Sequence, residues 1–220
     1  MPRRMLCLVA GLVMLTACRG PGSHAFTTQT TAPPAPVETA PATTAPVPPP
    51  PPPPIAITGT GFDLHTAGPV GPAAFDAAWA GVLDTLNRYL EAGVLTPLRS
   101  GGPANDLTPF FTPSTAERVI PGGPDRFAFI DENLPPVSDV RAEAAVAGLT
   151  ALAGPDGIMS VVTAGLDLRL VGHINGALVT VTRTGELVLV PEGGTWRIDA
   201  YDISVTRTIA DSITTTTVRS

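Results

Sequence analysis

The chain has 220 residues, of which 44% are hydrophobic and 15% are charged, and its formal net charge is −6. This length allows one medium-sized domain or two small ones. All 13 cationic residues are arginine, and an acidic chain without clustered cations is a poor binder of nucleic acid, because phosphate neutralisation requires such clusters.

Residues 1–17 have the features of an export signal. Arg3 and Arg4 supply positive charge, and residues 5–15 are apolar. This run is shorter than the roughly 20 residues that cross a bilayer, but it suits the apolar region of a secretory signal. It ends in Leu15-Thr16-Ala17-Cys18, which resembles the bacterial lipobox. The alternative is an ordinary signal peptide in which the cysteine is incidental.

The resemblance to the lipobox implies that cleavage makes Cys18 the first residue and that its sulfur carries lipid. Each buried CH₂ contributes about 0.8 kcal/mol, and two or more acyl chains anchor a protein stably. We therefore expect the protein on the outer side of the cell membrane, held there through Cys18. The other cysteine, Cys7, lies in the discarded segment, so neither cysteine supports a disulfide framework.

Residues 18–54 are expected to form a disordered tether. The segment is rich in Thr, Ala and Pro, and it ends in seven consecutive prolines, residues 48–54. Such a segment has almost nothing to bury, and its prolines favour an extended, semi-rigid polyproline II spacer. A ligand for a proline-binding module is the alternative interpretation.

Residues 55–208 are expected to form a single domain that begins with a weak strand at 55–64 and then a helix. Apolar residues at helical spacing predict this helix from Pro72 to Ala92; they are Phe75, Trp79, Val82, Leu83, Leu86, Leu90 and Val94. Gly93 ends this pattern. Thr112 followed by Pro113 predicts the start of a short helix, and residues 124–132 predict another.

From Val137 onward the apolar period changes from 3.6 to 2, which indicates strands. Residues 140–152 fit either a helix or a strand, and the hairpin turn at residues 154–157 favours the strand. Asn175-Gly176 predicts the next turn. A long strand with a bulge or kink at Gly185 follows, then a last strand at 195–207. Residues 209–220 are expected to be a flexible tail.

This order of elements predicts an α+β fold in which a long helix and short helices pack on a curved antiparallel sheet of about four strands. Residues 185–190, residues 196–202 and the segment at Phe110-Phe111-Thr112 resemble nuclear-transport-factor-2-like domains, in particular extracytoplasmic actinobacterial members. The resemblance implies a cone-shaped domain with a cavity between the sheet and the long helix. It implies no catalytic residue.

The sequence contains few residues that bind metals or cofactors. Its three histidines form no His-x-His or His-Glu-x-x-His pattern, so we expect no metal. Without lysine, the chain has no Walker-type motif and no Schiff-base chemistry. We expect no cofactor.

The candidate catalytic residues are Asp202, His173 and Tyr89. In a regular last strand Asp202 would face the core, where a carboxyl group has a raised pKa and can act as a general base. The alternative is that a bulge near residues 200–202 turns Asp202 outward, that His173 belongs to the following turn, and that Tyr89 lies on the helix surface. Trp79 and Trp196 are expected to fill the core between helix and sheet rather than to bind a sugar.

Two functions remain open from the sequence. One is a non-catalytic binding or accessory domain that docks an envelope protein or holds a small apolar ligand. The other is an acid/base enzyme of the isomerase or dehydratase type, acting in the cavity of the cone fold. They differ in whether polar groups converge in a closed apolar pocket.

Overall fold

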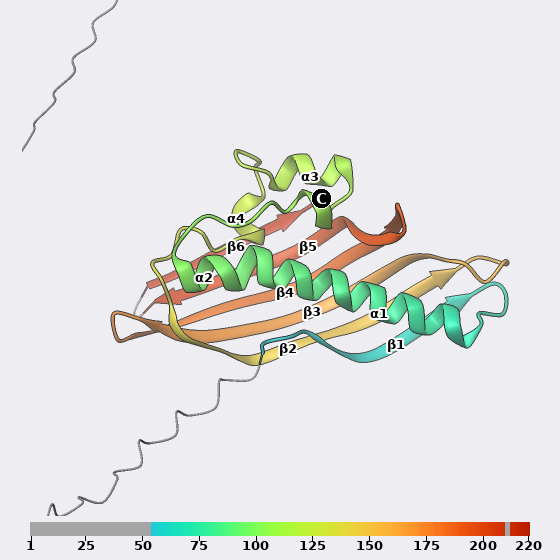
Figure 1. The fold of residues 1–220 in the computed structure, drawn as a ribbon, viewed down its shortest axis with the longest axis horizontal. Coiled ribbons are helices and arrows are strands. Elements are labelled where there is room, and N and C mark those ends of the chain that lie inside the picture. Colours follow the sequence, from blue (N-terminus) through green and yellow to red (C-terminus); the bar gives the residue numbers. More distant parts are fainter. Residues whose placement is uncertain (1–53, 210–211) are drawn as a thin grey trace, which may run out of the picture. The chain divides into compact units, whose positions relative to one another are not determined.

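The computed structural model describes residues 54–209 and 212–220. The expected signal peptide, Cys18 and nearly all of the expected tether lie outside these residues. The described chain forms one six-stranded sheet with the strands in chain order (Figure 1). The strands are β1 (Thr58–Thr66), β2 (Ser138–Ala153), β3 (Met159–Ile174), β4 (Ala177–Glu192), β5 (Thr195–Ile209) and β6 (Ser212–Arg219).

The expected fold class is wrong. The sheet has six strands rather than about four, and it is mixed, because β1 runs parallel to β2 while all other neighbours are antiparallel. The nuclear-transport-factor-2-like architecture with its antiparallel sheet is therefore not supported. The two strands beyond the expected four are the edges of the sheet: β1, which corresponds to the weak strand expected at 55–64, and β6, which was not expected. Most residues of β1 are exposed, so burial imposes little apolar alternation on its sequence.

The expectation of a flexible tail at residues 209–220 is also wrong, because most of these residues form a strand. Residues 212–219 form β6, which pairs with β5 from Ile209↔Ser212 to Asp202↔Arg219. Threonine is favoured in strands because its branched side chain fits a pleated surface, and β6 contains four in succession. The backbone amide of Ser220 donates to the carbonyl of Tyr201 at 2.9 Å, which fixes the end of this strand.

The long helix begins at Pro72, as predicted, but it continues past Gly93. Helix α1 (Pro72–Tyr89) runs into the π-helical segment η1 (Leu90–Leu95) and then into α2 (Thr96–Ser100). A Cβ at Gly93 would lie 2.8 Å from the carbonyl oxygen of Phe129, so this glycine allows close packing rather than ending the helix. The helix ends at Gly101, whose φ of 64° is left-handed and is typical of a helix C-terminus.

Three short helical segments follow: η2 (Thr108–Phe110), α3 (Pro113–Val119) and α4 (Arg126–Phe129). The predicted start of α3 at Pro113 is confirmed. The Thr112 hydroxyl, however, donates to the Asp199 carboxylate at 2.9 Å, and no side chain caps the helix. Helix α4 is shorter than the predicted helix at 124–132, because extended residues begin at Ile130.

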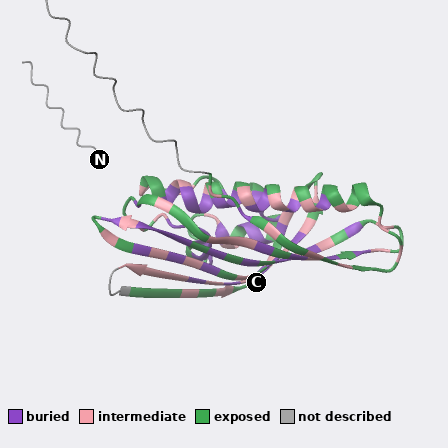
Figure 2. Ribbon diagram, turned by 90° about the horizontal axis from the view of Figure 1, so that it is seen from below, coloured by how far each residue is buried: buried purple, intermediate pink, exposed green. Residues whose placement is uncertain are grey.

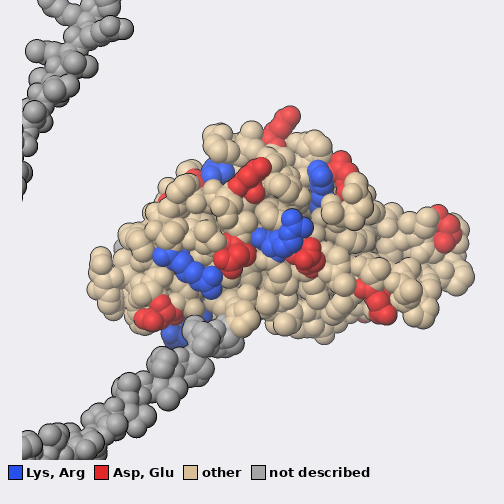
Figure 3. All heavy atoms as spheres, viewed as in Figure 1, with Lys and Arg blue, Asp and Glu red and all other residues tan. Residues whose placement is uncertain are grey.

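The helices cover one face of the sheet, here called the inner face, and leave the other, the outer face, without a helical layer (Figure 2). Side chains alternate between the two faces along each strand, and those of the inner face form the core with the helices. Central core residues are Leu86 and Val82 of α1, Phe111, Leu168, Leu187 and Ile198. On the side of the molecule shown in Figure 3, acidic and basic side chains are interspersed.

Candidate functional site

The three candidate catalytic residues lie in three different environments. Tyr89 is buried on the inner face, not on the helix surface, and its hydroxyl donates to the Phe129 carbonyl at 3.2 Å. His173 is a partly exposed residue near the end of β3, and its Nδ1 lies 3.9 Å from Asp139. Asp202 accepts hydrogen bonds from Arg219 of β6. The structure brings no two of the three into one site.

A bulge in β5 determines the direction of Asp202. Val188 pairs with Ala200 and Leu189 pairs with Ile198, so Asp199 is the extra residue. The alternation therefore shifts by one position, and Tyr201 rather than Asp202 lies in the core. The bulge lies one residue before the predicted range, and Asp202 lines an open hollow that also includes Glu186.

The described residues bear on two further kinds of binding, that of a metal ion and that of a membrane. No group of three or more His, Cys, Asp or Glu residues in 54–209 and 212–220 is placed to hold a metal ion. Of the helices in these same ranges, none combines the length and the apolar character needed to span a membrane.

The most unusual chemistry is a group of three charged residues, of which Asp131 and Arg183 are buried and Arg207 is partly exposed. Asp131 is fully buried and follows α4. One of its oxygens accepts from Arg183 Nη2 at 2.5 Å, and the other accepts from Arg207 Nε at 2.6 Å. These contacts join β4, β5 and the loop after α4. We call the three residues the Arg–Asp–Arg cluster.

The Arg–Asp–Arg cluster carries an excess positive charge, because two guanidinium groups share one carboxylate. The nearby Tyr89 does not neutralise it, since burial raises the pKa of this phenol to about 12 and keeps it uncharged. Nη1 of Arg183 is buried without a hydrogen-bond partner among the described residues. Buried charges are normally paired, so this imbalance requires an explanation.

Arg207 connects the cluster to a hollow of about 380 Å³. We call this hollow the β6 pocket, because Thr214 and Thr216 of β6 form one side. Of the described residues that line it, only Arg207 and Asp131 are charged. The apolar part of the lining is Phe127, Ile130, Leu134 and Ile209.

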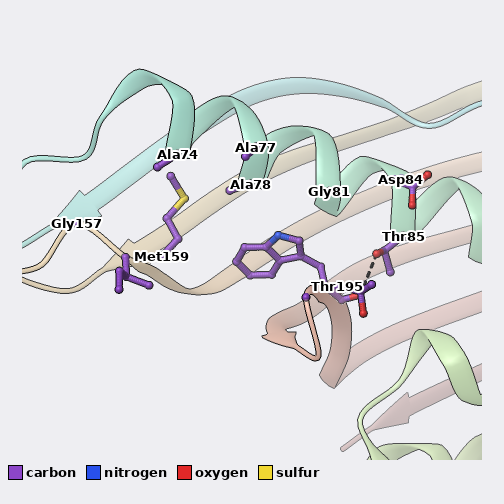
Figure 4. A pocket seen from close by; sticks show the side chains of 12 residues that line it. Ala74, Ala77, Ala78, Gly81, Asp84, Thr85, Gly157, Met159 and Thr195 are labelled. Atoms are coloured by element: carbon purple, nitrogen blue, oxygen red, sulfur yellow. Dashed lines mark hydrogen bonds between the residues drawn. The ribbon is translucent and has the colours of Figure 1, made fainter.

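A second hollow, of about 450 Å³, lies along the first half of α1. Figure 4 shows Ala74, Ala77, Ala78 and Gly81 of the helix on one side of this hollow. The small residues leave room for Trp196, and a Cβ at Gly81 would lie 2.7 Å from its ring. We call this hollow the α1 groove.

Trp196 is held in place below α1. The hydroxyl of Thr85 donates to the Trp196 carbonyl at 2.9 Å (Figure 4). Trp196 and Trp79 are both half-buried and pack against the core, as expected from the sequence. Ile158, on the rim of the α1 groove, is 65% exposed.

The cluster residues were not among the sequence-based candidates, although the strands contain a signal for two of them. Arg183 continues the apolar phase of Val179 and Val181, and Arg207 continues that of Ile203 and Val205. A cation in the apolar phase of a strand points into the core, and it then needs a partner. Asp131 has no such signal, because it lies in a loop.

Comparison with models of known protein families, with curated proteins and with solved structures finds no match to this chain.

Proposed function

We propose that the protein is a lipid-anchored extracytoplasmic lipoprotein whose domain is a non-catalytic binding module of the cell envelope. The lipobox-like residues 15–18 and the proline-rich segment up to residue 54 support the anchor and the tether. The β6 pocket supports the binding function, with a small, mostly apolar molecule as the ligand.

The observation that carries this proposal is the lining of the β6 pocket. Small-molecule sites are concave hollows of about 300–1,000 Å³, mostly apolar, with a few placed polar groups. The β6 pocket has about 380 Å³, and its lining consists of four apolar residues, the charged pair Asp131 and Arg207, and the uncharged polar residues Asn133, Thr214 and Thr216. The acid/base alternative requires Asp202, His173 and Tyr89 to converge, and they lie apart.

A pocket-filling substitution tests the binding function. Thr216 lines the β6 pocket, whereas Thr217, the next residue of β6, points to the opposite face of the sheet. We expect 1-octanol to bind the wild-type chain in NMR titrations, Thr216→Trp to abolish this binding, and Thr217→Trp to preserve it. Absence of octanol binding to the wild type, or unchanged binding to Thr216→Trp, would contradict the proposal.

Exchange of the cysteines tests the anchor. We expect Cys18→Ala to abolish incorporation of labelled fatty acid and to move the protein from the membrane fraction to the soluble fraction, because the acyl chains supply the membrane affinity. Cys7→Ala is the matched control, since Cys7 would leave with the signal peptide. An unchanged membrane fraction for Cys18→Ala would refute the anchor.

Docking of an envelope protein at the α1 groove is a second candidate function. The apolar lining of the groove favours it, because Ile158, Met159 and Trp196 line the same hollow and contiguous apolar surface marks contact sites. If it is correct, Ile158→Glu reduces co-purification of an envelope protein. The control is Leu178→Glu in β4, where Leu178 is 53% exposed and lies outside the groove. Equal effects of the two substitutions would exclude the groove.

A further inference from the structure

We propose that the ligand of the β6 pocket is an amphiphile with an apolar body and one anionic group, which Arg207 binds. This inference rests on the proposed binding function, because it assigns the chemical class of the ligand to the same pocket. Its basis is the combination of an apolar lining with an excess of one positive charge.

The Arg–Asp–Arg cluster has two cations and only one anion. Asp131 already accepts one hydrogen bond on each oxygen, from Arg183 and from Arg207. Two cations therefore face one anion in the cluster, and Nη1 of Arg183 is buried without a partner among the described residues. A ligand with one negative charge would make the numbers of cations and anions equal.

Neighbouring carboxylates do not supply the missing charge. Glu132 binds Arg126 through both of its oxygens, at 2.7 and 2.9 Å, and these hydrogen bonds lower the pKa of Glu132. Asp125 binds Arg118 at 2.6 Å. Each of these carboxylates has its own arginine, so the excess positive charge stays with Arg183 and Arg207.

Arg207 is held in a fixed position. Its Nε donates to Asp131, and its Nη2 donates to the carbonyls of Phe127 and Ile130 at 2.7 and 2.8 Å. Nη1 has no protein partner in the described ranges, and the side chain lines the β6 pocket with 12% of its surface exposed. A guanidinium group fixed in this way is a preorganised donor for a carboxylate or phosphate oxygen.

The apolar residues of the lining indicate that the rest of the ligand, apart from its anionic group, is apolar. Phe127, Ile130, Leu134 and Ile209 have no polar side-chain group, while Asn133, Thr214 and Thr216 are the uncharged polar residues of the lining. A small inorganic anion could bind Arg207 and these polar groups, but it would leave the apolar side chains without a contact. A neutral hydrocarbon would fill the space but leave the Arg207 donor without a partner, which is unfavourable once water is displaced. An amphiphile satisfies both parts of the pocket, and the surrounding low dielectric strengthens its charged hydrogen bond.

The test compares octanoate, 1-octanol and acetate on the full-length chain carrying Cys18→Ala, using calorimetric titration at neutral pH. A hydrogen bond to a charged group should make octanoate bind at least roughly tenfold more tightly than octanol. Acetate should bind far more weakly than octanoate. Equal affinities for octanoate and octanol would overturn this inference but leave the binding pocket intact. Absence of binding by both would overturn the pocket as well.

The residue-specific test uses Arg207→Met. It should reduce octanoate affinity to the level of octanol and leave octanol affinity unchanged. Arg219→Met is the control, because Arg219 binds Asp202 outside the β6 pocket. Wild-type octanoate affinity in Arg207→Met would overturn the proposal.

The pH dependence of octanoate binding to the chain with Arg207 intact tests the proposal even if Arg207→Met does not fold. Octanoate affinity should fall to that of octanol as the pH is lowered through the pKa of the octanoate carboxyl group, while octanol affinity should stay constant. Octanoate affinity that does not change over this pH range would overturn the proposal.

Discussion

Ion pairs are buried on the inner face of the sheet and exposed on the outer face. On the inner face Arg183 and Asp131 are completely buried and have nearly all their hydrogen bonds within the protein. On the outer face Arg169 pairs with Glu143, and both side chains are about half exposed. The same type of ion pair thus has different consequences, because an exposed pair contributes little to stability while a buried one is costly to break.

The outer face also contains rows of threonines. Thr182 pairs with Thr206, which pairs with Thr215 of β6. Cross-strand pairs of this kind contribute a few tenths of a kcal/mol to about 1 kcal/mol each. The comparison shows that the buried core and the buried ion pairs lie on the inner face, while the outer face carries exposed polar and charged pairs.

The largest effect should come from Asp131→Ala. This substitution leaves the buried Arg183 and the partly exposed Arg207 without a carboxylate, and breaking a buried pair typically costs about 3–5 kcal/mol. Asp167→Ala on the outer face, where Asp167 is exposed, should change the free energy of unfolding by less than about 0.5 kcal/mol. Urea denaturation measures both. Similar losses for the two variants would remove the distinction between the faces.

Two glycines in neighbouring strands give the next contrast. Gly185 has a φ of 137°, and a Cβ there would overlap the backbone oxygen of Asp202. Gly165 has its nearest neighbour, the oxygen of Gly148, at 3.7 Å. Gly185→Ala should therefore lower the free energy of unfolding by about 2–4 kcal/mol, whereas Gly165→Ala should be neutral or slightly stabilising. The bulge or kink expected at Gly185 does not appear in the strand pairing, which is continuous through this residue. A stable Gly185→Ala variant would show that neither the positive φ nor the close approach of Asp202 requires glycine there.

Alkaline titration tests the inner face, because both tyrosines, Tyr89 and Tyr201, are buried there. The chain has two, and burial raises the pKa of Tyr89 and of Tyr201 to about 12. Between pH 10 and about 12 the unfolded chain loses these protons while the folded chain retains them. The contribution of the tyrosines to stability should therefore be constant below pH 10 and then fall, for Tyr89 by about 1.4 kcal/mol per pH unit.

The absorbance of tyrosinate and the urea midpoint as a function of pH measure this effect. Tyr89→Phe should retain only the part of the pH dependence that belongs to Tyr201. If the folded wild-type chain shows tyrosinate absorbance near pH 10, the two phenols are not protected by the inner face.

The smallest effect should come from Thr182→Ala on the outer face. The substitution removes one cross-strand contact and some preference for the strand, so we expect a loss of about 0.5 kcal/mol or less. Thermal unfolding of Thr182→Ala and Thr206→Ala checks this estimate. A loss comparable with that of Asp131→Ala would mean that the outer face is more than a solvated surface.

The parts of the fold that could be predicted are those whose signals are local. Alternation indicated β3, β4 and β5, and Asn175-Gly176 forms the turn between β3 and β4. The edge strand β1 was indicated only as a weak strand at 55–64, because most of its residues are exposed, and its parallel pairing with the distant β2 was not predicted. The other edge, β6, was missed, because its pairing depends on β5 rather than on a local pattern. The continuation of the helix past Gly93 depends on Phe129, which the local sequence does not reveal.

The candidate site was harder to predict than the fold. Arg183 and Arg207 have a local signal in the apolar phase of their strands, but their shared partner Asp131 is 52 and 76 residues away in the chain. The residues that the sequence suggested were three titratable groups in separate elements, Asp202 in β5, His173 near the end of β3 and Tyr89 in α1. The direction of Asp202 depended on a bulge at Asp199, and periodicity indicated this bulge only approximately.

The position of β6 has a consequence for how a ligand enters and leaves. This strand is a wall of the β6 pocket, and within the described chain it pairs only with β5. Edge strands with a single neighbour open locally at a lower free energy than the centre of a sheet. We therefore expect ligand exchange to follow the fraying of residues 212–219 while α1 and β2 to β5 stay closed. Hydrogen exchange in this strand should slow when the pocket is occupied.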